Sequence, residues 1–270
     1  MVVQHNLSAM NTNRQMGVVT SALQKSTEKL SSGYKINRAG DDAAGLSISE
    51  KMRSQIRGLN KASDNAQDGI SLIQVAEGAL NETHSILQRM NELATQAAND
   101  TNTSVDRQSI KDEIEQLNEE LDRISTTTQF NKQDLLTGGF SGKLQVGALE
   151  GQTMDVKISL AVSANGLKVS VVEVSTNAKA GAAMQSIQDA IESVSKQRSK
   201  LGAIQNRLEH TINNLDTNAE NTQAAESRIR DTDMADEMVQ YSKNNILSQA
   251  GQSMLAQANQ QTQGVLSLLG

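Results

Sequence analysis

Apolar residues recur at heptad spacing along a proline-free stretch of about 55 residues, from Ala44 to Ala98. The first apolar row consists of Met52, Leu59, Ala66, Ile73, Leu80, Leu87 and Ala94. A second row begins at Leu72 and widens the stripe in the later half. The pattern predicts one continuous helix of roughly 80 Å, and the width of the stripe predicts that this helix lies in a bundle or a polymer.

Two further stretches repeat at the same spacing. Residues Ile110 to Ile124 follow a polar turn at 99–106 and alternate steps of four and three. Residues Met184 to Ile229 keep the heptad pattern throughout. Because the connection at 99–106 is short, we expect a helix that folds back along the first one, followed later by a second long helix.

The two ends of the chain carry much thinner apolar stripes. Residues 2–32 have weak seam positions, and a last helix is expected after a break near Asp233. Helices with so little apolar surface are not expected to be stable alone. The glycine-containing stretch 31–45 is predicted to be a connector, with Asp41 or Asp42 capping the long helix and Asp233 capping the last one.

Between Phe130 and about Thr176 the apolar period changes to two. This alternation is typical of short strands, and the turn signals are Gly151 and Asn165–Gly166. The whole pattern predicts a mainly α fold, an elongated antiparallel helical bundle or coiled coil with a small β-hairpin element and paired terminal helices. The hairpin element is expected at about 140–175.

Charge is distributed unevenly along the chain. Residues 1–61 hold nine Lys/Arg against four acids, a net charge of +5, and residues 216–240 hold seven acids against two Arg, a net charge of −5. If the two long helices are antiparallel, these segments lie side by side. We therefore predict contacts among Arg53, Arg57, Glu220 and Glu226, with two independently solvated faces as the alternative.

Composition argues against most kinds of chemistry. The 270 residues contain no cysteine and no proline, and the three histidines (His5, His84 and His210) lie far apart in sequence. No hydrolase, nucleotide-binding or metal motif occurs. We expect no catalytic, cofactor or metal site and no cofactor. The net charge of −6 and the lack of a long apolar run predict no nucleic-acid partner and no membrane insertion.

Four long segments of the sequence have a distinctive composition. They are LSSGYKINRAGDDAAGLSISEKMRSQIRGL at 30–59, NAQDGISLIQVAEGALNETHSILQRMNELATQAAN at 65–99, AESRIRDTDMADEM at 225–238 and NILSQAGQSMLAQANQQTQGVLSLLG at 245–270. All four closely resemble bacterial flagellin. Many flagellins carry large variable domains in the middle, where this chain has only a short loop near Ser163–Leu167. The sequence resembles a minimal flagellin that lacks those outer domains.

The resemblance implies a structural protein that polymerises with many copies of itself into the helical filament used for swimming. It implies an inner-tube domain of residues 1–44 plus 231–270 and an outer-tube domain of residues 45–230. The flagellar export chaperone and the hook–filament junction and cap proteins are the implied partners. Type III export without a cleaved signal places the protein outside the cell, in the flagellum. The implied polymerisation residues are Val2, Leu7, Met16, Val19, Leu23, Leu30, Met238, Ile246, Met254, Val265, Leu268 and Leu269.

The resemblance also implies detection by host flagellin receptors. The positions that match the Toll-like receptor contacts of stimulatory flagellins are Arg89, Leu93 and Glu113. Arg89 and Leu93 are four residues apart, so we expect one helical face to present both. Packing between subunits is the alternative role for these residues.

Three other functions are alternatives to a filament subunit. The hook–filament junction protein shares the helical ends but diverges in the segments quoted above. An enzyme-bearing flagellin relative would need a catalytic insertion, and residues 143–175 are too short to contain one. An adhesin role has no distinctive residues here.

Overall fold

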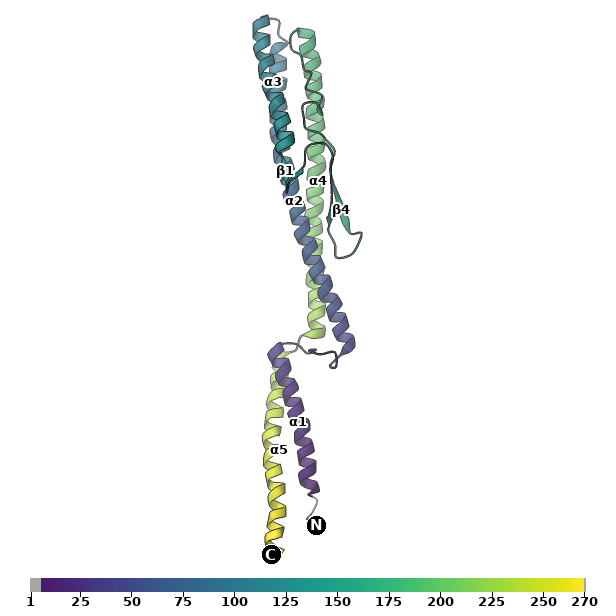
Figure 1. Ribbon diagram of the computed structural model, residues 1–270, viewed down its shortest axis with the longest axis vertical. Helices are drawn as coiled ribbons and strands as arrows, with labels where there is room; N and C mark the ends of the chain where they lie inside the picture. The colour runs from purple at the N-terminus through teal and green to yellow at the C-terminus, as the bar shows by residue number, and fades with distance from the viewer. Residues whose placement is uncertain (1–5, 270) are drawn as a thin grey trace. The chain divides into compact units, whose positions relative to one another are not determined.

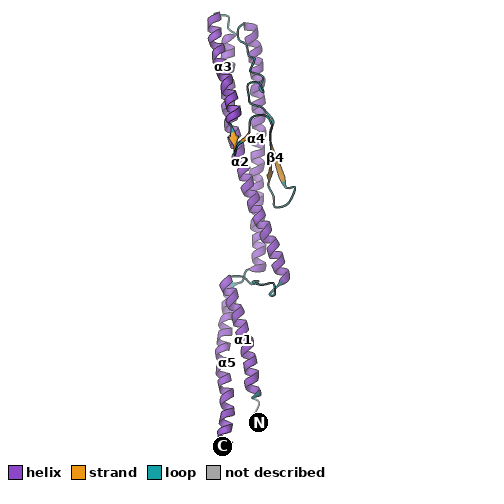
Figure 2. Cartoon of the chain, viewed as in Figure 1, coloured by secondary structure: helices purple, strands orange, loops and turns teal. Residues whose placement is uncertain are grey.

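The computed structural model describes residues 6–269 of the chain, with side chains described as far as residue 261. These residues form five helices and two small antiparallel sheets (Figures 1 and 2). The helices are α1 (Leu7–Ser32), α2 (Ala43–Ala97), α3 (Ser104–Thr127), α4 (Asn177–Arg230) and α5 (Met234–Leu269). The strands are β1 (Gln129–Phe130), β2 (Gln133–Asp134), β3 (Phe140–Gln145) and β4 (Thr153–Ile158). The mainly α fold predicted from the heptad pattern is confirmed.

The chain divides into two compact units. One comprises Met1–Ser54 with Asn221–Gly270, here called the terminal unit, and the other comprises Gln55–Glu220, here called the central unit. The central unit contains most of α2 and α4 together with α3 and all four strands. The terminal unit contains α1 and α5 and the connectors next to them.

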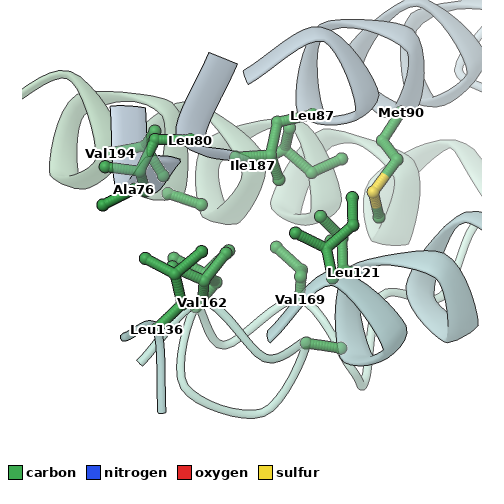
Figure 3. Packing of buried hydrophobic residues seen from close by; sticks show 14 of the residues in the cluster. Ala76, Leu80, Leu87, Met90, Leu121, Leu136, Val162, Val169, Ile187 and Val194 are labelled. Carbon is green, nitrogen blue, oxygen red and sulfur yellow. The ribbon is translucent and has the colours of Figure 1, made fainter. Parts of the chain in front are cut away.

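Helices α2, α3 and α4 lie side by side in the central unit (Figure 1). The Arg198 guanidinium lies 3.7 Å from the Glu77 carboxylate, and Ser63 Oγ donates to Asp216 3.0 Å away, so α2 and α4 are antiparallel. Heptad side chains of all three helices are buried in one apolar core (Figure 3). Examples are Leu87 on α2, Leu121 on α3 and Ile187 on α4, each fully buried. The apolar stripes predicted from the heptad pattern are the helix faces that pack together in this core.

A β-hairpin packs against a face of α2 that carries small residues. Strands β3 and β4 pair from Phe140 opposite Ile158 to Gln145 opposite Thr153. A Cβ atom added to Gly58 would lie 2.8 Å from the Cβ of Ala148, which is in the hairpin turn. A Cβ atom added to Gly69 would lie 2.3 Å from the end of the Leu144 side chain. Asn65 lies between these glycines along α2 and donates to the Gln145 carbonyl, so the hairpin backbone approaches the helix closely.

The turn at Asn165–Gly166 differs from the prediction. The hairpin ends at Ile158, and residues 163–169 fold into a compact turn in which Leu167 N–H donates to Ser163 and Val169 N–H donates to Ala164. Leu167 and Val169 are buried in the core. Contact with the helical core takes up their apolar side chains, so this segment packs on the bundle as an irregular loop and does not extend into a second strand pair.

In the terminal unit α1 and α5 run antiparallel (Figure 1). Asn6 Nδ2 donates to the Ala258 carbonyl at 2.9 Å, and Lys29 Nζ lies 3.4 Å from Glu237 Oε2. Met16 packs near Gly251. The pairing of the terminal helices predicted from sequence is confirmed.

The connectors of the terminal unit are held by caps and by backbone pairing. Asp42 Oδ1 accepts from Gly45 N–H at 2.9 Å at the start of α2, and Asp233 Oδ1 accepts from Ala235 N–H at 2.9 Å at the start of α5. Both predicted caps are confirmed, with Asp42 rather than Asp41 in the first position. Tyr34 pairs with Asp231 as a β-bridge. No helix among the described residues is long and apolar enough to cross a bilayer.

Candidate assembly surface

The large apolar side chains that remain exposed are concentrated on the terminal helices. Of the fifteen exposed among the described residues, nine lie on α1 and α5. Large apolar side chains are normally removed from water, and burial of each contributes about 1.5–3 kcal/mol. The nine, here called the terminal apolar set, are Leu7, Met10, Val18, Met234, Met238, Val239, Ile246, Leu247 and Met254.

Helix α1 uses two different faces. Four of the residues predicted for polymerisation are half-buried in the subunit itself: Met16, Val19, Leu23 and Leu30. By contrast Leu7, Met10 and Val18 are exposed, Leu7 to 72%. Their spacing places these three on one side of the helix. Helix α1 therefore has a half-buried seam of four residues and a separate unpaired apolar stripe.

Helix α5 carries exposed apolar residues on several sides. Met234 and Met238 are four residues apart and share one side, whereas Val239 and Ile246, seven apart, share another. Leu247 and Met254 lie on a third side. A helix that is apolar all round is normally surrounded by other elements. Since α1 alone cannot cover three sides of α5, this helix has surface for additional neighbours.

Polar contacts hold the C-terminal end of α1 against the connector that follows it. Arg38 Nε lies 2.9 Å from Glu28 Oε1, and Asp41 Oδ2 accepts from the Arg38 and Asn37 N–H groups at 3.0 and 3.3 Å. The N–H of Arg38 is the main reason that the pKa of Asp41 is lowered from its ordinary value. The charged carboxylate therefore stabilises the connector between α1 and α2.

One of the four residues predicted to form charge contacts between the long helices has a neutral hydrogen-bond partner in the structure. Glu226 Oε1 accepts from Ser49 Oγ at 2.7 Å. Among the ion pairs within 4.0 Å that the described residues form, none involves Arg53, Arg57, Glu220 or Glu226. Pairing among these four side chains stays a prediction.

The three positions matched to receptor contacts are only partly on the surface. Arg89 Nη2 lies 2.9 Å from Glu113 Oε1, and Arg89 Nη1 lies 3.2 Å from Glu92 Oε2. The hydrogen bond to Glu113 is the main reason that the pKa of Arg89 is raised. Leu93 is 2% exposed and lies in the core. Arg89 is therefore on the surface and Leu93 packs inside the bundle, and receptor contact at these positions stays a prediction.

Some predicted positions lie outside the described residues. These are Val2 and His5 and the side chains of Val265, Leu268 and Leu269. Conversely, five members of the terminal apolar set are not among the residues predicted for polymerisation: Met10, Val18, Met234, Val239 and Leu247. The signal available for them was an apolar residue off the heptad seam, which by itself does not distinguish a contact surface from a single exposed side chain.

The rest of the described surface offers little to a small molecule or a metal. Hollows beside the loop 159–176 are lined by residues such as Lys168, Val171 and Ser186. The described residues contain no group of three or more His, Cys, Asp or Glu that could hold a metal ion. The terminal apolar set is the largest group of exposed apolar side chains among the described residues.

Comparison with known proteins identifies the family. The family model for the bacterial flagellin N-terminal helical region matches residues 3–141, and that for the C-terminal helical region matches residues 184–269. Flagellin from Halalkalibacterium halodurans is 56% identical over 271 residues, and flagellin from Bacillus subtilis is 52% identical over 304 residues. Each alignment covers 100% of this chain and 100% of its relative.

A solved structure agrees with these matches. The crystal structure of Bacillus cereus flagellin superimposes with a TM-score of 0.51 at 33% identity, over 60% of this chain and 94% of that one. Both helical regions of the family are thus present, and the segment between them, residues 142–183, is short. The chain therefore belongs to the bacterial flagellin family and is a structural subunit of the flagellar filament, not an enzyme.

Proposed function

We propose that the terminal apolar set forms the contacts between copies of this flagellin in the filament. In this assignment residues 1–44 and 231–270 make an inner tube and residues 45–230 make an outer tube. The supporting observation is that, among the described residues, α5 exposes large apolar side chains on three sides although it pairs with α1. Several neighbouring copies can supply the missing cover.

The same observation accounts for an open polymer. The apolar stripe of α1 and the sides of α5 are different surfaces, so a contact between them is head-to-tail and not self-complementary. Head-to-tail contacts whose rotation does not close generate helical filaments instead of rings. We expect the terminal helices to become fully ordered only on assembly, since their own pairing buries few large side chains.

A charged side chain at the proposed contact tests this function. Ile246, which is 66% exposed, is replaced by Asp, and assembly induced by ammonium sulfate is followed by sedimentation and electron microscopy. We expect Ile246→Asp to abolish filaments, because a desolvated carboxylate is costly. The matched control is Val171→Asp at the 85% exposed Val171 of the central unit, and it should assemble normally. Filaments of the Ile246→Asp variant at the wild-type subunit concentration would refute the proposal.

The proposal extends to the export route and to the accessory partners. We propose type III export to the cell exterior, with binding to a flagellar export chaperone and to the hook–filament junction and cap proteins. A free chain with exposed apolar side chains on α1 and α5 needs protection before assembly, which supports the chaperone contact. Co-purification with the chaperone should be lost on deletion of residues 245–270 and retained on deletion of residues 1–30.

Recognition by the flagellin-sensing Toll-like receptor is a second proposal. Its support is the exposed Arg89–Glu113 ion pair, which joins α2 and α3 on the surface. In this proposal Leu93 holds α2 in place from the core and does not contact the receptor. Arg89→Ala should lower activation of receptor-bearing reporter cells while leaving the circular dichroism spectrum unchanged. Unchanged activation at limiting protein would exclude this site.

A further inference from the structure

The oxidisable sulfur atoms of this flagellin are unevenly placed. The chain has ten methionines and no cysteine, so methionine thioethers are its readily oxidised groups. Met90 and Met154 are buried in the central core, at 0% and 4% exposure. The four methionines that are exposed among the described residues are Met10, Met234, Met238 and Met254. All four belong to the terminal apolar set.

We infer that these four residues, here called the assembly-face methionines, are oxidation sites that make filament assembly sensitive to peroxide. The inference rests on the proposed role of α1 and α5 as contacts between copies. In a free subunit the four sulfur atoms face water, and in a filament they lie against neighbouring chains. Peroxide therefore reaches them before assembly and is excluded from them afterwards.

The chemistry needs only a peroxide as oxidant. The thioether sulfur attacks one peroxide oxygen, a sulfur–oxygen bond forms and the oxygen–oxygen bond breaks. The second oxygen leaves as water after proton transfer, so methionine loses two electrons and the peroxide gains them. The sulfoxide product is polar and accepts hydrogen bonds. Burial of such a group in an apolar contact without a donor is unfavourable.

The position of the four residues determines the size of the effect. Met10 lies on the exposed stripe of α1, Met234 and Met238 on one side of α5, and Met254 on another. One oxidised subunit thus carries a polar group in more than one contact. We expect the subunit concentration needed for assembly to rise about tenfold or more after oxidation, since each desolvated polar group weakens association by roughly that factor.

The test uses full-length subunits and hydrogen peroxide. Subunits are oxidised, the peroxide is removed, and assembly in ammonium sulfate is measured by sedimentation over a range of concentrations. Peptide mass spectrometry should show oxygen at the assembly-face methionines and none at Met90 or Met154. Treatment with both methionine sulfoxide reductases should restore assembly, which general damage to the fold would prevent.

The matched variant replaces all four assembly-face methionines by leucine. Leucine is of similar volume and is not oxidised, so this variant should assemble equally well before and after peroxide. A Met90→Leu variant keeps the four exposed sulfur atoms and should remain peroxide-sensitive. Unchanged assembly of oxidised wild-type subunits would overturn the inference, and so would loss of assembly in the peroxide-treated leucine variant.

Oxidation of preformed filaments separates this inference from the proposed function. If the four residues are oxidised as fast in filaments as in free subunits, α1 and α5 are not buried by neighbouring copies, and both proposals fail. If filaments protect them but oxidised subunits still assemble at the original concentration, only the inference about peroxide fails. Protection in filaments combined with blocked assembly supports both.

Discussion

Short polar side chains decide where the helices of this flagellin begin. At α3, Thr103 and Asp106 form a capping box in which Asp106 Oδ2 accepts from the Thr103 hydroxyl at 2.7 Å and from its N–H at 2.9 Å. The Thr103 hydroxyl group is the main reason that the pKa of Asp106 is lowered. Such boxes satisfy donors that a helix start leaves free.

This cap predicts a dependence of stability on pH. Because the pKa of Asp106 is lower in the folded state, its stabilising effect is complete above the ordinary aspartate value of about 3.9 and is lost as pH falls through the lowered value. The thermal midpoint of wild type should therefore exceed that of Asp106→Asn above about pH 5, and the difference should shrink toward pH 2. A pH-independent difference would contradict this cause. Asp68→Asn, at an exposed position within α2, is the matched control.

Single-residue predictions from sequence succeeded where the local pattern contains the whole cause. Asp42 and Asp233 were recognisable as caps because a cap needs only a short polar side chain before a helical pattern. Leu93 belongs to the second apolar row of the predicted stripe and is buried in the core as that row indicates, whereas the receptor contact that the resemblance assigns to it stays a prediction. The positions of Val239 and Leu247 on the open sides of α5 depend on packing that the local sequence does not encode.

At the scale of elements, the hairpin depends on two glycines that leave room on α2. Ala148 at the hairpin turn packs on Leu59, Ala62, Leu215 and Ala219, which form a small cluster of their own. The missing Cβ at Gly58 permits this contact. A glycine in a helix interior costs about 0.5–1 kcal/mol relative to alanine, so its presence here has a packing reason.

Comparison of two glycines on α2 tests that reason. Gly78→Ala meets nothing within 4 Å and should raise the free energy of unfolding by about 0.5–1 kcal/mol. Gly58→Ala would place its methyl group 2.8 Å from the Ala148 Cβ, which cannot rotate away. We expect Gly58→Ala to lower the free energy of unfolding by about 1–2 kcal/mol, as overpacking does. Denaturant unfolding measures both, and equal stabilisation by the two substitutions would contradict the packing role.

Element types followed well from periodicity, and the exception is informative. The heptads of α2, α3 and α4 lie where the sequence places them, since a repeated stripe over many turns admits few alternatives. The Asn165–Gly166 pair indicated a second hairpin, but Leu167 and Val169 are buried against the bundle instead. Short alternating runs specify a strand only when a partner strand is available, and here the helical core competes for the same side chains.

At the scale of the whole molecule, the distribution of apolar surface supports the proposed contacts between copies. Among the described residues, the central unit buries most of its large apolar side chains in its own core and leaves four exposed, whereas the terminal helices leave nine exposed. The sequence already contained this contrast, as thick stripes in the middle and thin stripes at the ends. It did not show which sides of α5 remain open, because that depends on how α1 docks.

Backbone amide hydrogen exchange, compared between free subunits and filaments, tests the central claim most directly. We predict rapid exchange across α1 and α5 in free subunits and strong protection of the same amides in filaments, with the core amides of α2, α3 and α4 protected in both states. Equal protection of α1 and α5 in the two states would contradict the claim that these helices are stabilised by contact with other copies.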